Sequence, residues 1–203
     1  RMMLVEEAAP DAGALPVAAL RGYLRLATGF EMATDAAEDA ALAGFLRAAI
    51  ATIEARTGKV LLRRPFRLRL EEWRDPTRQP LPLAPVASVE AVEVTDAAGQ
   101  VAAIEPAAWR LVPDSQRPAL VGAGGWLPAV PSNGFVTVRF TAGFGETWAG
   151  VPADLAQAAI MLAARYHEDR GEPQQGAAVP FAVGALLDRW RQVRTLAGRG
   201  GRA

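Results

Sequence analysis

The sequence contains no cysteine, a single histidine (His167) and a single lysine (Lys59) among its 203 residues. The absence of cysteine excludes disulfides, thiol chemistry and cysteine-ligated metal sites, and leaves the redox compartment undecided. The sequence also lacks an apolar run of the length that crosses a bilayer, and its first residues lack the charged and then apolar pattern of a signal peptide. We therefore expect no membrane segment, and take the cytoplasm as the default location.

The chain also has no excess of either charge, because 22 Lys and Arg side chains balance 22 Asp and Glu side chains. Net charge therefore gives no argument for binding to nucleic acid or to a membrane surface. Hydrophobic residues make up 51% of the sequence and charged residues 22%, which is typical of a globular protein of one or two domains. Codon bias can explain why nearly all basic residues are arginine.

Two segments, one toward each end of the chain, have the apolar periodicity of helices. The spacing predicts helices over about 16–27, 34–58, 152–170 and 180–197. Pro152 suits a first helical turn, and Asp154 places a negative charge at the positive end of the helix dipole. The second helix has the clearest pattern, with Leu42, Leu46 and Ile53 on one face.

Between these segments the apolar residues alternate, as they do in half-buried strands. The alternation predicts strands within 60–71, 86–95, 100–104, 109–112, 120–121 and 135–142. Four prolines are expected to prevent regular structure between the first two of these strands: Pro76, Pro80, Pro82 and Pro85.

The fold predicted from this order is α+β, with a bundle of about four helices and a small β-rich unit inserted between the second and third. Each helical half is too short to form a good core alone, so residues 16–59 and 151–197 are expected to pack together, with residues 60–150 as the insertion. Residues 1–15 are expected to be a flexible N-terminal segment, and residues 198–203 a flexible basic tail.

No set of residues has the spacing of an active site. His167 lies beside Glu168 and Asp169, which would suit a metal or acid–base chemistry, but consecutive helical residues point in different directions. The glycine-rich residues 122–125 are followed by Trp126 rather than by the Lys and Ser or Thr of a phosphate-binding loop. We therefore predict that the chain is not an enzyme and has no cofactor and no metal site.

Two clusters of arginines remain. The first puts two to four positive charges on one side of the first predicted strand; its members are Arg63, Arg64, Arg67 and Arg69. It is either a stripe that faces DNA or a solvated face balanced by Glu71 and Glu72. The second lies near the C-terminus with only Asp188 opposing it; its members are Arg189, Arg191, Arg194, Arg199 and Arg202. It either stabilises the end of the last helix or forms a basic tail that becomes ordered on a partner.

Four stretches, taken together and in order, carry a resemblance to a known family. They are residues 36–59, a helix ending in Ile-Glu-x-x-Thr-Gly; 81–99, a Pro-Val-x-Ser-Val strand and its turn; 136–145, a strand that enters an aromatic-bearing Ala-Gly turn; and 151–171, a helix with a Val-Pro start and an aromatic and then Glu-x-Arg end. A fifth, Val179-Pro180-Phe181, precedes the last helix. The set resembles the head–tail connector (adaptor) proteins of long-tailed phages and phage-derived gene transfer agents.

The resemblance implies a structural protein that forms a ring, usually dodecameric, beneath the portal of a DNA-filled capsid. Such a ring extends the DNA channel and offers a surface to stopper or tail-side proteins. The implied partners are the portal protein, stopper or tail-side proteins, further copies of this chain, and double-stranded DNA bound without sequence specificity; no membrane is implied. The implied location is the neck of the particle, after assembly in the cytoplasm of a bacterial host.

On this interpretation, each arginine cluster has an expected partner. The portal contact is expected at Trp190 with Arg189, Arg191, Arg194, Arg199 and Arg202. The DNA-channel contact is expected at Arg63, Arg64, Arg67 and Arg69. The alternatives are a stopper or tail-completion protein of the same particle, a small enzyme, and a DNA-binding module. The expected helices disfavour a stopper, which tends to be mostly β, and the arginine- and alanine-rich composition favours a gene transfer agent over an infectious phage.

Overall fold

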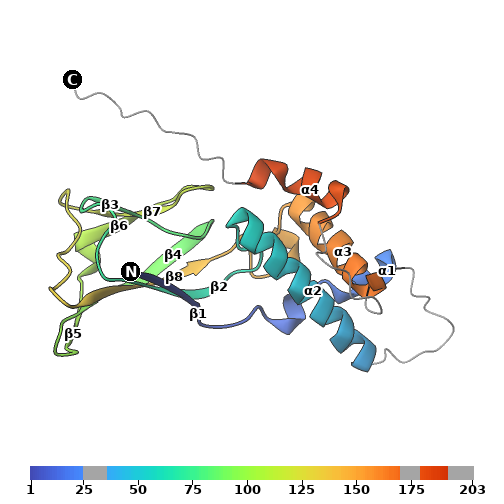
Figure 1. The fold of residues 1–203 in the computed structure, drawn as a ribbon, viewed down its shortest axis with the longest axis horizontal. Helices are drawn as coiled ribbons and strands as arrows, with labels where there is room; N and C mark the ends of the chain where they lie inside the picture. The colour runs from blue at the N-terminus through green and yellow to red at the C-terminus, as the bar shows by residue number, and fades with distance from the viewer. Residues whose placement is uncertain (25–35, 170–178, 192–203) are drawn as a thin grey trace, which may run out of the picture.

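The computed structural model describes residues 1–24, 36–169 and 179–191, and places the helices toward one end of the molecule and the strands toward the other (Figure 1). Each end has its own cluster of buried hydrophobic side chains. All strands but the first lie between the second and third helices in the chain. The predicted α+β class, with a β-rich unit inserted into a set of helices, is therefore confirmed.

The helices of the described residues are α1 (Val17–Tyr23), α2 (Ala36–Thr57), α3 (Ala153–Glu168) and α4 (Phe181–Leu187). Single turns of 3₁₀ helix lie at Ala12–Ala14, Pro106–Ala108, Trp148–Gly150 and Asp188–Trp190. The strands are β1 (Met2–Glu6), β2 (Arg64–Leu70), β3 (Arg78–Pro80), β4 (Val86–Thr95), β5 (Val101–Ala103), β6 (Trp109–Val112), β7 (Ala119–Gly122) and β8 (Phe135–Ala142).

Helices α2 and α3 form the centre of the helical core, and α1 and α4 pack against them. The predicted apolar face of α2 is buried, including Leu42, Leu46 and Ile53. Helix α3 contributes buried alanines as well as leucines, and small side chains let neighbouring helices approach closely. Each fully buried leucine or isoleucine contributes roughly 1.5–3 kcal/mol. Gly58, with a φ of 67°, ends α2 in the left-handed conformation that glycine adopts without strain.

The β-rich end consists of two antiparallel sheets that enclose a second core. The larger has the order β1-β2-β8-β4-β5, and the smaller has the order β3-β7-β6. In the larger sheet, Phe140 lies opposite Phe66, and Val138 lies opposite Leu68. These side chains form its inner face, which packs with hydrophobic residues of the smaller sheet such as Leu120. The alternation of β8 predicted from the sequence is therefore present in the structure.

The last helix is shorter than expected, and two expectations about strands are wrong. Helix α4 ends at Leu187 and is followed by a single 3₁₀ turn to Trp190 and an extended Arg191, rather than continuing over 180–197; residues 192–197 lie outside the described residues. Residues 2–6 are not flexible, because they form β1, which pairs with β2 from Met2 opposite Leu70 to Glu6 opposite Phe66. The proline-rich stretch is not without regular structure, because β3 pairs with β7. In both cases a distant strand supplies the hydrogen bonds, so the local pattern gives no signal. Pro80 is tolerated because it ends a strand at the edge of its sheet.

Arg64 joins the sheet to the helices. Its guanidinium donates two hydrogen bonds to the Glu54 carboxylate on α2, from Nη1 at 3.0 Å and Nη2 at 2.6 Å. Nη2 also donates to Glu6 on β1 at 3.1 Å, and Nη1 donates to the backbone oxygen of Leu62. Burial alone would lower the pKa of Arg64, but its hydrogen bonds to Glu54 and Glu6 outweigh this and raise the pKa. The buried guanidinium therefore stays charged and holds three elements together.

Lys59, the only lysine, makes a second connection at this junction. Its side chain is fully buried, and its Nζ donates to the backbone oxygen of Ser115 and to Oε1 of Gln116, both at 2.7 Å. Burial lowers the pKa of Lys59, and the charge of Asp114 offsets part of that effect. The loop between β6 and β7 is thereby attached to the second residue after the end of α2.

We expect Glu54→Gln to destabilise the chain by about 3 kcal/mol, because it leaves a buried guanidinium without its main counter-charge. Urea denaturation would measure the loss. Glu38→Gln is the matched control on the same helix, since Glu38 pairs with Arg21 at a more exposed position and the same substitution should cost less than about 1 kcal/mol. Equal losses in the two variants would contradict the role given to Arg64.

Candidate functional site

The residues considered for catalysis do not come together in a catalytic arrangement. The His167 ring packs edge-on against Phe45, with 5.7 Å between ring centroids. Within the described ranges, no group of three or more His, Cys, Asp or Glu side chains could hold a metal ion. Gly122 serves the local packing of the loop, because a Cβ there would lie 2.1 Å from the backbone of Trp126. Of the helices in the part that is described, none has the length and hydrophobicity needed to cross a bilayer.

The structure divides the four arginines expected on the first strand, and leaves two of them, Arg67 and Arg69, on one side. Arg64 points to the inner side of the sheet, alternating with Pro65, and is only 7% exposed. Arg67 and Arg69 point to the opposite side, which we call the outer face. Arg63 precedes the strand, and its Nη1 lies 3.7 Å from a Glu146 carboxylate oxygen. Because side chains alternate along a strand, the sequence spacing alone places Arg64 on the opposite side from Arg67 and Arg69.

The outer face gains an arginine that sequence reasoning missed. Arg139 on β8 lies directly opposite Arg67 in the register. Its guanidinium lies 3.7 Å from Glu93 on β4, and that of Arg67 lies 3.5 Å from Glu7. The Arg69 guanidinium lies over the Phe135 ring at 3.4 Å from its centroid. Like charges on opposed strand positions are unfavourable, and here Glu7 and Glu93 each offset one of the two arginines.

The first residues of the C-terminal cluster, Arg189 and Trp190, make intramolecular contacts with Asp154 on α3. The Trp190 indole donates to Oδ2 of Asp154 at 2.7 Å and contacts the Phe144 ring edge-on, at 5.5 Å between centroids. Arg189 pairs with the same Asp154 oxygen at 2.6 Å, and its guanidinium also lies over the Trp190 ring. These contacts anchor the end of the helical segment to the first turn of α3.

Of the remaining portal-contact candidates, only Arg191 falls within the described residues. Its side chain is exposed and pairs with Asp188 at 3.4 Å. Arg194, Arg199 and Arg202 lie outside the described residues. The Trp190 anchor therefore fixes the point from which residues 192–203 continue.

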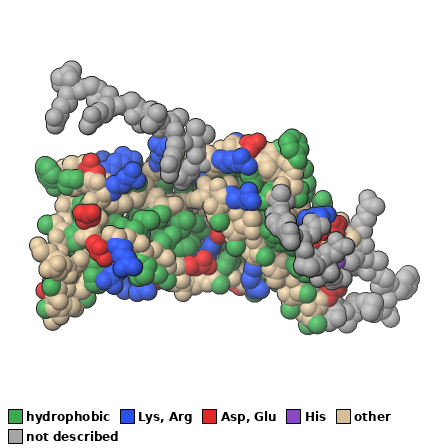
Figure 2. Space-filling view, in the orientation of Figure 1, with side chains coloured by type: hydrophobic (Ala, Val, Ile, Leu, Met, Phe, Trp, Pro, Cys, Tyr) green, Lys and Arg blue, Asp and Glu red, His purple; other side chains and the backbone are tan. Residues whose placement is uncertain are grey.

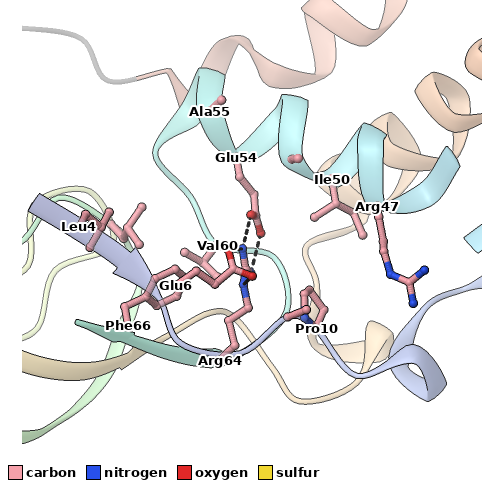
Figure 3. Close-up of a pocket in the computed structure, with 13 residues that line it drawn as sticks. Leu4, Glu6, Pro10, Arg47, Ile50, Glu54, Ala55, Val60, Arg64 and Phe66 are labelled. Carbon is pink, nitrogen blue, oxygen red and sulfur yellow. Dashed lines mark hydrogen bonds and ion pairs between the residues drawn. The ribbon is translucent and has the colours of Figure 1, made fainter. Parts of the chain in front are cut away.

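A pocket of about 520 Å³ lies where the two halves of the molecule meet, between β1, β2 and α2. Leu4, Ile50 and Phe66 contribute to its apolar wall, and the ion-paired Arg64 and Glu54 also line it (Figure 3). Figure 2 shows hydrophobic side chains in a hollow near the middle of the visible face. Most residues that line the pocket are apolar, and among its charged residues Arg64 pairs with Glu54 and Glu6.

The chain is similar to chains of gene transfer agent particles whose structures have been solved. No protein-family model and no curated protein matches the chain. Among solved structures, the chain is similar to one in the neck of an empty gene transfer agent (GTA) particle computed with C6 symmetry, with 52% sequence identity and a TM-score of 0.86. It is 53% identical, with a TM-score of 0.84, to a chain in the virion of a native GTA particle. It is 48% identical, with a TM-score of 0.81, to a chain in the neck of a native GTA particle computed with C12 symmetry. Each similarity covers 97% of this chain and 99% of the other.

Proposed function

This chain belongs to the head–tail connector family of long-tailed phages and gene transfer agents, and from that membership we propose that it is the adaptor of a particle neck. In this role, copies of the chain form a ring on the portal, extend the DNA channel and provide the surface on which stopper or tail-side proteins dock. The role is structural and requires no catalytic group.

The proposal rests on one observation. The chain is similar, over nearly its full length and theirs, to chains of GTA necks and virions. The sixfold and twelvefold symmetries of the two neck structures support a ring of identical subunits. The helical half supports an adaptor rather than a stopper, because α2 and α3 bury an extensive shared core and stoppers tend to be mostly β.

We infer that the portal contact begins beyond the Trp190 anchor. Residues 188–203 hold five arginines and a single acidic residue, Asp188. The contacts of Trp190 and Arg189 with Asp154 are made within the chain, so these two residues fix the start of the segment. Arg191, Arg194, Arg199 and Arg202 are then the candidates for binding an acidic groove on the portal.

Reversing the charge of Arg194, Arg199 and Arg202 to glutamate should weaken binding to isolated portal rings by roughly tenfold or more. The wild-type affinity should also fall as salt is raised, because salt screens exposed charges. Surface-based binding measurements with immobilised portal would give both quantities. A control variant with glutamate at the exposed positions Arg56, Arg74 and Arg110 has the same net charge and should bind normally. Undiminished portal binding after deletion of residues 192–203 would contradict this contact.

The outer face is our candidate for the wall of the DNA channel. Arg67, Arg69 and Arg139 lie on adjacent strands and their guanidinium groups are at least partly exposed. A row of such groups on each subunit of a ring would present repeated positive charge to the phosphates of the DNA, without reading its sequence.

Glutamate at both Arg67 and Arg69 should therefore reduce the retention of packaged DNA and the frequency of gene transfer, while leaving the melting temperature within a few degrees of wild type. DNA content per particle, measured by nuclease protection, is the direct readout. Arg74→Glu with Arg110→Glu is the control, because both side chains are exposed outside the larger sheet. If DNA content and transfer were unchanged in the outer-face variant, Arg67 and Arg69 would not face the channel.

A further inference from the structure

We propose that the free edge of β1 and the pocket behind it form the surface that receives an extended segment of the neighbouring copy of this chain. The inference rests on the ring of the proposed function, and adds which surface of each subunit holds the next one. It is carried by the exposed edge, by the pocket, and by the position of both midway along the molecule.

Strand β1 is an exposed edge strand that lacks the features that usually protect the edge of a sheet. It is the terminal strand of the larger sheet, so one side of its backbone has no partner strand among the described residues. Met2, Met3 and Leu4 are 60%, 50% and 37% exposed. Natural proteins usually protect such an edge with charges, proline or a bulge. In β1 the first charged side chain is Glu6, at its last position.

The pocket lies on the inner side of this edge. The register places Met2 and Leu4 on the inner face, opposite Leu70 and Leu68, whereas Met3 lies on the outer face opposite Arg69. An extended segment alongside β1 would use the free backbone groups of β1 for hydrogen bonds, and every second side chain of that segment would point toward the pocket. Main-chain pairing and an apolar pocket together are the elements of recognition by strand addition.

The position of this surface favours a second copy over the portal or a tail-side protein. The pocket lies between β1, β2 and α2. Figure 1 shows these elements meeting between the helical end and the β-rich end, and Figure 2 shows a hollow near the middle of the visible face. In a ring, each subunit meets two neighbours through two different patches, so one patch must accept what the other presents. In the proposed ring the long axis runs along the channel, so a surface at the middle of the molecule can adjoin those neighbours and the two ends are left for other proteins of the neck.

Two substitutions on β1 compare the effect of a charge at the pocket with that of the same charge on the opposite face of the strand. Leu4→Lys places a charge at the pocket, and we expect it to reduce the number of rings formed on isolated portals by tenfold or more. Met3→Lys makes the same change one residue away on the opposite face, and should reduce ring formation by less than about threefold. Equal ring formation by the two variants, with melting temperatures that show both to be folded, would overturn the proposal.

A photocrosslink identifies the occupant directly. Benzoylphenylalanine is placed at Met2 in an otherwise wild-type chain, and rings are assembled with portal and tail-side proteins. Irradiation should give a product that contains two copies of this chain and nothing else. The same group in place of Trp126, which is 67% exposed in the loop between β7 and β8, is the control and should give little of that product. A product with the portal or a tail-side protein would overturn the proposal. If the wild-type chain forms no ring on the portal, the proposed function itself fails.

Discussion

The buried charge of Arg64 is the constraint on which the arrangement of the two halves depends. A guanidinium removed from water is costly unless carboxylates surround it, and here they come from α2 through Glu54 and from β1 through Glu6. Glu54 also accepts a hydrogen bond from the backbone of Leu61, in the segment that connects α2 to β2. The helical core and the sheet core are therefore held in one relative position, because any other position leaves the charge without partners.

With that junction fixed, the subunit presents three separate surfaces. The outer face of the larger sheet carries the exposed arginines, the Trp190 anchor sets where the basic C-terminal segment starts, and the edge of β1 leads into the pocket at the middle. Each proposed partner suits the chemistry of its surface: DNA phosphates for the outer face, an acidic groove for the C-terminal segment and an apolar segment for the edge of β1. A rigid subunit is what a ring requires, since an error in the angle between neighbours would prevent the ring from closing.

Local periodicity in the sequence predicted the features that depend on local structure. The apolar face of α2, the start of α3 at Pro152 and the alternation of β8 all follow from neighbouring residues. The strand β1 and the pairing of Arg67 with Arg139 could not be predicted, because both depend on which strands lie side by side. Arg64 is an intermediate case. The alternation of the strand indicates that its side chain is on the buried side, but its partners Glu6 and Glu54 lie 58 and 10 residues away in the sequence, so the ion pairs could not be predicted.

The central claim is that this chain forms the first ring on the portal, and the mass of the complex tests it most directly. Purified portal and this chain would be mixed without any other neck protein, and weighed by native mass spectrometry alongside negative-stain imaging. The account predicts that the chain is monomeric alone, and that each portal gains twelve chains of 21.5 kDa arranged as a ring. Binding that occurs only after another neck protein has been added would contradict the adaptor role and indicate a stopper.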